Sequence, residues 1–214
     1  MYFDYSVVKE HKLYPMVSPV LRLLSHIVYR TKCFGTENIP QTGKLIIACN
    51  HIAFSDPAFI VAYSGRTVHF MAKSELFENR YISFIIRNMN AFPVKRNSSD
   101  RQALMYAKKI LANNWVLGIF PEGRRVRHSS PTDGKTGVAF LARVTGADIL
   151  PVCLYKTGTD WMRPKVTLRF GTVIKNSELG FANVDRAEEL KNATDMIMNS
   201  IKKLWEEENS DKNS

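Results

Sequence analysis

The chain has 214 residues, a length that fits one folded domain and is short for two. Its apolar fraction of 45% and charged fraction of 23% are those of a globular protein, which argues against a disordered chain and a multi-span membrane protein. The 30 Lys and Arg exceed the 20 Asp and Glu, and the net charge of +10 favours phosphate-rich partners: nucleic acid, anionic lipid or a phosphorylated substrate.

Three separated cysteines, with no CxxC pair, predict no disulfide framework, no metal site and a reducing compartment. The N-terminal residues lack the pattern of a secretory signal, so we expect the protein to begin at Met1.

The first expected element is an amphipathic helix over residues 16–29, where apolar side chains follow the i, i+3, i+4, i+7 spacing of one helical face. These side chains are Val17, Val20, Leu21, Leu24, Ile27 and Val28, with Ser18, Arg22, Ser25 and Arg30 on or near the other side. The segment is too short, and too interrupted by prolines, to cross a bilayer, which needs about 20 apolar residues. Two interpretations remain open: its apolar face packs on the protein core, or the helix lies flat in a membrane interface.

From residue 44 onward, short β-rich runs alternate with helical stretches, the pattern of a single mixed α/β layered domain. We expect strands over residues 44–49, 67–72, 91–94, 115–120, 149–155 and 166–170. We expect helices over residues 58–63, 81–88, 101–113, 138–145 and 186–208. No repeat or linker divides the chain, so the predicted organisation is an amphipathic segment 1–32, one domain 33–208 and a polar tail 209–214.

A histidine and a carboxylate follow the first predicted strand, His51 directly and Asp56 five positions later. Active sites of α/β folds lie at such strand ends. An imidazole can accept a proton from a hydroxyl, and a carboxylate on its other nitrogen fixes the tautomer, so we interpret the pair as a general base and its orienter. The alternative for Asp56, which precedes Pro57, is the start of a helix, where it would serve as a cap.

Cationic side chains follow two other predicted strands. Residues 120–125, Phe-Pro-Glu-Gly-Arg-Arg, come after a strongly apolar run, and residues 91–96 end in Lys95 and Arg96. Arginines at a strand exit can clamp a phosphate or carboxylate, and the alternative is a solvated basic loop. Lys135, ahead of the helix expected at 138–145, is a further candidate for anion contact.

Together these blocks resemble the 1-acylglycerol-3-phosphate acyltransferases of phospholipid synthesis. Asn50-His51 with Asp56 resembles the family's NHx4D block, and Phe120 to Arg125 resembles its FPEGTR block. Residues 90–96 and 149–152 are similar to two further blocks, and residues 73–76 to a segment between the first two. The chain departs from the pattern with Arg124 in place of Thr, Lys95 in place of Asp and Asn90 in place of Gly.

The resemblance implies an α/β domain of the glycerolphosphate acyltransferase type with His51 as the general base and Asp56 as its orienter. It implies that the acceptor's glycerol phosphate is bound by Arg96, Glu122, Gly123 and Arg125, and the candidate substrate-binding residues in full are Asn50, Lys73, Arg96, Glu122, Gly123, Arg124, Arg125 and Lys135. It also implies an acyl-CoA or acyl-carrier-protein thioester as co-substrate, with no cofactor and no metal.

The expected function is transfer of a fatty acyl group to the free sn-2 hydroxyl of 1-acylglycerol-3-phosphate, giving phosphatidic acid. The expected place is the cytoplasmic face of the cell membrane, as a peripheral enzyme with the membrane surface and a lysophospholipid as partners. Acyl transfer to glycerol-3-phosphate or a lyso-aminolipid is the alternative within enzymes. A basic nucleic-acid or membrane binding module would not explain His51 and Asp56, so we expect no nucleic-acid partner.

Overall fold

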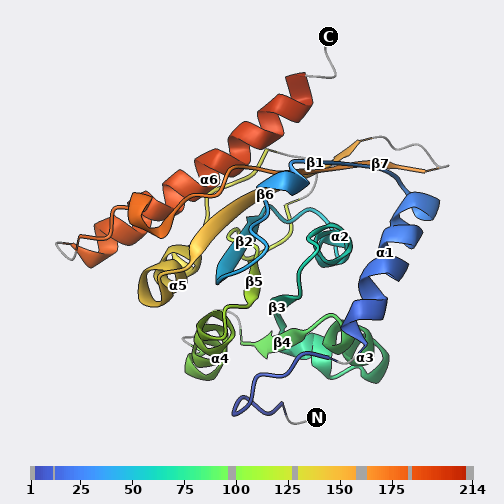
Figure 1. Ribbon diagram of the computed structural model, residues 1–214, viewed down its shortest axis with the longest axis horizontal. Coiled ribbons are helices and arrows are strands. Elements are labelled where there is room, and N and C mark those ends of the chain that lie inside the picture. Colours follow the sequence, from blue (N-terminus) through green and yellow to red (C-terminus); the bar gives the residue numbers. More distant parts are fainter. Residues whose placement is uncertain are drawn as a thin grey trace.

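The computed structural model describes residues 3–11, 13–95, 100–126, 130–157, 163–182 and 185–210. These residues build one seven-stranded sheet in the order β1-β7-β6-β2-β5-β3-β4. Figure 1 shows helices α4, α5 and α6 on one side of the sheet and α1, α2 and α3 on the other. The predicted mixed α/β layered domain is therefore confirmed.

The strands are β1 Arg30–Phe34, β2 Leu45–Cys49, β3 Val68–Lys73, β4 Ala91–Val94, β5 Val116–Ile119, β6 Asp148–Thr157 and β7 Lys165–Phe170. The α-helices are α1 Tyr14–Val28, α2 Asp56–Tyr63, α3 Arg80–Asn88, α4 Arg101–Ala112, α5 Gly137–Thr145 and α6 Arg186–Ser210. Short 3-10 turns occupy Thr36–Asn38, Ser74–Phe77 and Asn176–Glu178. All the expected elements are present, with ends that shift by about two residues at most.

Strand β1 is the element that the sequence analysis did not predict. It pairs in parallel with β7 at the edge of the sheet. Its residues alternate between exposed and half-buried positions, and it follows α1 after a single residue, so neither a buried apolar run nor a turn marks it. The expected boundary between residues 32 and 33 falls inside this strand, and α6 extends two residues into the expected tail.

Strand β2 is the centre of the sheet and separates two apolar cores. Its five residues are all buried, which fits a parallel strand covered on both faces. Leu45, Ile47 and Cys49 pack with residues of α1, α2 and α3, whereas Ile46 and Ala48 pack with residues of α4, α5 and α6. Strands β5 and β6 flank β2 in parallel, so the carboxyl ends of these strands meet at one edge.

Helix α1 turns its polar side inward and its apolar side outward. The Ser18 hydroxyl donates to the Val61 carbonyl at 3.0 Å, and Ser25 Oγ lies 2.8 Å from the Tyr63 hydroxyl of α2. Of the expected apolar face, Val17 and Leu21 pack partly against the core. The outer surface carries exposed Met16, Val20, Leu23, Leu24, Ile27 and Val28.

Core packing of the whole apolar face is therefore the wrong interpretation of α1, because four residues of that face, Val20, Leu24, Ile27 and Val28, are exposed. Among the helices that the structure describes, none is both long and apolar enough to cross a membrane.

Candidate active site

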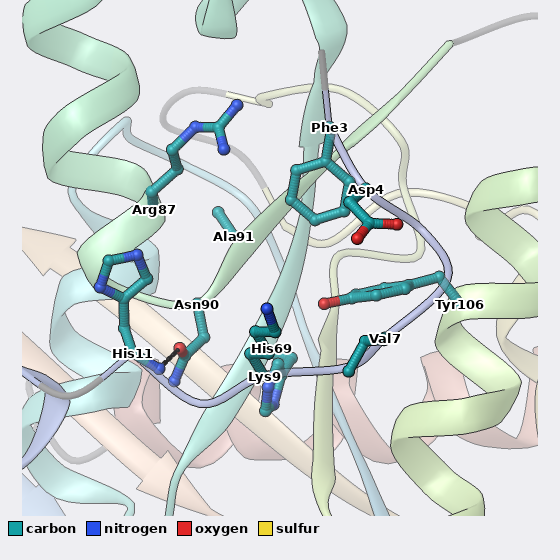
Figure 2. A pocket seen from close by; sticks show the side chains of 10 residues that line it. All are labelled: Phe3, Asp4, Val7, Lys9, His11, His69, Arg87, Asn90, Ala91 and Tyr106. Carbon is teal, nitrogen blue, oxygen red and sulfur yellow. Dashed lines mark hydrogen bonds between the residues drawn. The ribbon is translucent and has the colours of Figure 1, made fainter. Parts of the chain in front are cut away.

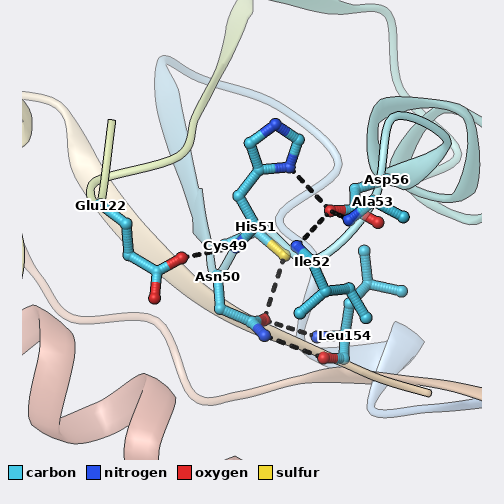
Figure 3. Close-up of polar contacts among 8 residues, drawn as sticks. All are labelled: Cys49, Asn50, His51, Ile52, Ala53, Asp56, Glu122 and Leu154. Carbon is cyan, nitrogen blue, oxygen red and sulfur yellow. Dashed lines mark hydrogen bonds and ion pairs between the residues drawn. The ribbon is translucent and has the colours of Figure 1, made fainter. Parts of the chain in front are cut away.

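The turn between β2 and α2 holds His51 and Asp56 against each other. His51 Nδ1 lies 2.7 Å from Asp56 Oδ2, and the same oxygen accepts the backbone N–H groups of Ile52 at 2.7 Å and Ala53 at 2.8 Å (Figure 3). Asp56 is the first residue of α2 and is 1% exposed, but its carboxylate points back to the turn and the helix has no side-chain cap. The interpretation of Asp56 as a helix cap is therefore wrong.

These contacts determine the histidine tautomer. Asp56 Oδ2 already accepts two backbone N–H groups and so acts as an acceptor toward His51, which places the proton of the His51–Asp56 hydrogen bond on Nδ1. The lone pair of the neutral ring is then on Nε2, and the imidazole side chain is 12% exposed. The arrangement leaves Nε2 able to accept a proton from a hydroxyl group.

The loop after β5 forms hydrogen bonds with both the backbone N–H and the backbone carbonyl of His51. Glu122 Oε2 accepts the His51 N–H at 2.8 Å, and the His51 carbonyl accepts the Val126 N–H at 2.7 Å. The other Glu122 oxygen accepts the backbone N–H of Thr132 at 2.9 Å. The side chain is 5% exposed and both of its oxygens accept protein N–H groups, so the structure gives Glu122 a role in holding the turn, and its contact with the substrate stays a prediction.

Asn50 pairs with strand β6 in the structure, and its expected role in substrate binding stays a prediction. Its side chain donates to the Leu154 carbonyl at 2.9 Å and accepts the Leu154 N–H at 2.8 Å, as a paired strand residue would (Figure 3). Asn50 is 1% exposed. The amide therefore continues the β2–β6 pairing by one step and fixes the chain just before His51.

An apolar cavity of about 220 Å³ opens beside the His51 ring. Phe120 stacks on the imidazole with ring centroids 4.2 Å apart and an interplanar angle of 23°. The remaining wall comes mainly from α1, α2, α3 and β3, through residues that include Leu21, Ala58, Phe70, Leu76, Ile86 and Met89. The largely apolar lining of this cavity suits a hydrocarbon chain.

The structure brings several of the predicted cationic residues toward this turn. Lys73 lines the cavity with His51 and forms an exposed ion pair with Glu75 at 2.8 Å. Arg124 and Arg125 are exposed. In the sequence they lie between Glu122 and Val126, the two residues that form hydrogen bonds with the His51 backbone.

Gly123 allows the turn that carries these arginines. Its φ of +67° is left-handed, and an added Cβ would come within 3.0 Å of Lys135 Cε. Lys135 is thereby packed along the same loop, and its backbone N–H donates to the Pro121 carbonyl at 2.8 Å. Arg96 lies outside the described residues.

Cys49 is the thiol nearest to His51 along the chain, but it is fully buried under the turn. Burial raises the pKa of the Cys49 thiol well above its usual range, so the group stays protonated and is not a nucleophile. Sequence reasoning missed Phe120 and Val126 as partners of His51 and Thr132 as a partner of Glu122. Phe120 was visible in its motif, but the stacking and the backbone contacts are made only in three dimensions.

The chain is similar in sequence to known acyltransferases. The family model described as Acyltransferase matches residues 30–155. The 1-acyl-sn-glycerol-3-phosphate acyltransferase of Bacillus subtilis (strain 168) is 26% identical over 196 residues, 90% of this chain and 96% of that protein. The enzyme of the same name from Streptococcus pneumoniae is 31% identical over 88% of this chain and 71% of its own length.

Among solved structures, the 1-acyl-sn-glycerophosphate (LPA) acyltransferase PlsC from Thermotoga maritima has the same fold. The TM-score is 0.68 at 23% identity, and the match covers 94% of this chain and 84% of that one. The predicted fold type is thereby confirmed. The chain belongs to the acyltransferase family.

Proposed function

We propose that the protein transfers a fatty acyl group from an acyl thioester to the sn-2 hydroxyl of 1-acylglycerol-3-phosphate and so forms phosphatidic acid. The observation that carries this proposal is the 2.7 Å contact of His51 Nδ1 with buried Asp56, beside an apolar cavity. The names of the similar proteins from two bacteria support the same acceptor.

In the proposed mechanism, His51 Nε2 removes the proton of the acceptor hydroxyl as its oxygen attacks the thioester carbonyl. Asp56 holds the ring and stabilises the imidazolium that forms. Collapse of the tetrahedral intermediate breaks the C–S bond, and the thiolate leaves and takes up the proton from the imidazolium. No acyl-enzyme forms, and no cofactor is required.

The cavity is proposed to hold an acyl chain with its carbonyl beside His51. Each CH₂ group transferred from water contributes about 0.8 kcal/mol, so even a few carbons give useful binding energy. We assign the acceptor phosphate to the cations around the turn, Lys73, Arg124, Arg125 and Lys135. Arg96, which the family resemblance implies as a further contact, stays a prediction. Guanidinium groups suit a phosphate because their N–H groups can donate in pairs.

We further propose that the enzyme works as a peripheral protein at the cytoplasmic face of the membrane. The outward apolar side of α1 supports this, as do exposed Arg30, Lys32 and Lys165, which line a cavity with His26 and Tyr29 at the end of α1. Each Lys or Arg near an anionic membrane contributes about 1 kcal/mol. Acyl-CoA and acyl carrier protein both remain candidate donors, since each presents the thioester on a polyanionic carrier.

The proposed function is tested by incubating the purified protein with acyl-CoA or acyl carrier protein and a panel of acceptors. The panel contains 1-acylglycerol-3-phosphate, glycerol-3-phosphate and a lyso-aminolipid, and products are identified by mass spectrometry. Phosphatidic acid should be the main product, with no acyl group left on the intact protein. Preferential acylation of another acceptor, or a stable acyl-enzyme, would contradict the proposal.

A further inference from the structure

Helix α3 carries an apolar patch that faces solvent. Its members are Tyr81, Phe84 and Ile85, which are 74%, 67% and 58% exposed. A surface helix normally turns its apolar side to the core, and a group of exposed aromatic and aliphatic side chains marks a contact surface. The α3 patch therefore has the character of an interaction surface.

Contacts on the inner side of α3 fix this orientation. Arg87 Nε donates at 3.0 Å to the Oγ of Ser83, a residue that is 1% exposed. The Arg87 guanidinium lies 5.5 Å from the ring centroid of Phe3 and 5.4 Å from that of Phe77. Figure 2 shows Arg87 pointing from α3 toward Phe3 in the N-terminal segment. Helix α3 thus packs through Ser83 and Arg87 and leaves the α3 patch outside.

The α3 patch continues into the mouth of the cavity beside His51. Among the residues that line this cavity, the exposed ones are Phe54, Lys73 and Ile85, and they mark its mouth. Ile85 belongs to the α3 patch, and Phe54, in the turn after His51, is 55% exposed. The cavity that is proposed to hold an acyl chain therefore opens onto an apolar surface.

The exposed charges beside the patch balance each other. Lys73 pairs with Glu75 at 2.8 Å, and Arg80 and Glu78 are both exposed. The Arg80 guanidinium lies 5.5 Å from the ring centroid of Tyr81, and such tyrosine and arginine side chains are common at the level of lipid headgroups. Apolar burial, rather than charge, is therefore the attraction at this surface.

A lipid bilayer is the partner that fits both the patch and the cavity. An acyl chain that reached His51 through water would expose each of its CH₂ groups on the way, at a cost that rises with chain length. A mouth that touches the hydrocarbon of a bilayer removes this step. A folded protein partner at the same place would instead close the mouth to lipid substrates.

We propose that the α3 patch and Phe54 insert into the hydrocarbon edge of a lipid bilayer and place the mouth of the cavity against it. The acyl chain then passes from the bilayer into the cavity without crossing water. This inference rests on the proposed acyl transfer, and it gives α3 a membrane contact in addition to that of α1.

Fluorescence tests the insertion without requiring activity. The whole protein with Phe84→Trp is mixed with vesicles of phosphatidylcholine and phosphatidylglycerol whose acyl chains carry bromine, a quencher of tryptophan. The added tryptophan should lose fluorescence against the background of the three native tryptophans. Met105→Trp, at an exposed residue of α4 on the other side of the sheet, should add no quenched signal. Absence of quenching in Phe84→Trp, or equal quenching in the two variants, would overturn the proposal.

The route of the acyl chain is tested by the ratio of two rates, one with a long-chain lysophospholipid in vesicles and one with a short-chain acceptor dissolved as monomers. Replacing Tyr81 and Phe84 together with Ser should lower this ratio at least about tenfold, because two aromatic contacts with the bilayer are lost. Met105→Ser and Met196→Ser, at exposed residues of α4 and α6, should each leave the ratio within about twofold. An unchanged ratio in the α3 double variant would contradict the proposal.

Failure of the bilayer contact and failure of the proposed function are distinguishable. If the wild type acylates none of the acceptors while Phe84→Trp shows quenching, the bilayer contact stands and the proposed function fails. If the α3 double variant turns a dimer into a monomer and keeps the wild-type ratio, the patch binds a second copy of the chain and the proposal is overturned.

Discussion

At the scale of single residues, His51 is held by contacts that a linear sequence does not display. Its ring is fixed by Asp56 and stacked by Phe120, and its backbone N–H is accepted by Glu122. The sequence showed that a His and a carboxylate follow one strand and that Glu122 follows another. It could not show that Glu122 is used internally, because its partner is 71 residues away and its exposure depends on the folded loop.

Glu122→Gln tests the positioning role of this carboxylate. The amide of glutamine keeps the shape of the side chain but has one acceptor oxygen where two are needed. Its NH₂ group must therefore lie against either the His51 N–H or the Thr132 N–H, so that two donors face each other. We expect kcat to fall about 10–100-fold with little change in KM, and the free energy of unfolding to fall by about 1–3 kcal/mol. Steady-state kinetics and urea unfolding measure both.

A different outcome for Glu122→Gln would restore the role expected from the sequence. If the KM for the lysophospholipid rose at least tenfold while kcat and stability were unchanged, Glu122 would act as a substrate contact.

His69 makes the stability of the protein depend on pH. The ring is 1% exposed and stacks on Trp115 at 5.2 Å, and burial lowers its pKa from 6.5 to about 4. The unfolded chain takes up the proton near pH 6.5, whereas the folded protein resists it until about pH 4. The stabilising contribution is therefore complete above pH 6.5 and is lost as the pH falls toward 4, by roughly 3 kcal/mol in all.

His69→Phe keeps an aromatic ring against Trp115 but removes the titrating group. Urea unfolding at pH 7.5, 6 and 5 should show a shallower loss of stability in this variant than in the wild type. Equal pH slopes for the two proteins would show that other groups cause the acid sensitivity.

At the scale of elements, most helices and strands were predictable because apolar periodicity and helix-start signals agree along most of the chain. Strand β1 was not predicted because it is an edge strand with exposed polar residues at alternate positions. The outward direction of α1 also could not be predicted. A periodic stripe shows that a helix has an apolar face, but its neighbours decide whether that face meets the core. Here inward Ser18 and Ser25 bind α2 instead.

The apolar side of α1 can be tested as a membrane contact. Leu23 and Ile27 are 62% and 59% exposed, so replacing both with Asp should leave the fold intact. Burial of such a side chain contributes roughly 1.5–3 kcal/mol, so the double variant should bind anionic vesicles at least tenfold more weakly in a sedimentation assay.

Met105→Asp is a matched control for this assay, because Met105 is 54% exposed on α4, on the other side of the sheet. It should bind vesicles like the wild type. Equal binding by the α1 double variant and the wild type would remove α1 from the membrane contact.

At the scale of the whole molecule, the parallel sheet assembles the site from distant parts of the chain. Asn50 pairs with Leu154, 104 residues away, and the ends of β2 and β5 bring Glu122 to His51. The meeting of these blocks could be predicted, since carboxyl ends of parallel strands share an edge. The sequence could not predict which residues of these blocks face the substrate and which support the turn, because this depends on side-chain burial in the folded protein.

The most direct test of the central claim is the initial rate of phosphatidic acid formation by His51→Ala at saturating acceptor and donor. If His51 is the base that deprotonates the acceptor hydroxyl, the rate should fall by about 10²–10⁴ while lipid binding is retained. Lys203→Ala, at an exposed residue of α6, should keep its activity. A His51→Ala protein that retained more than about a tenth of the wild-type rate would contradict the account.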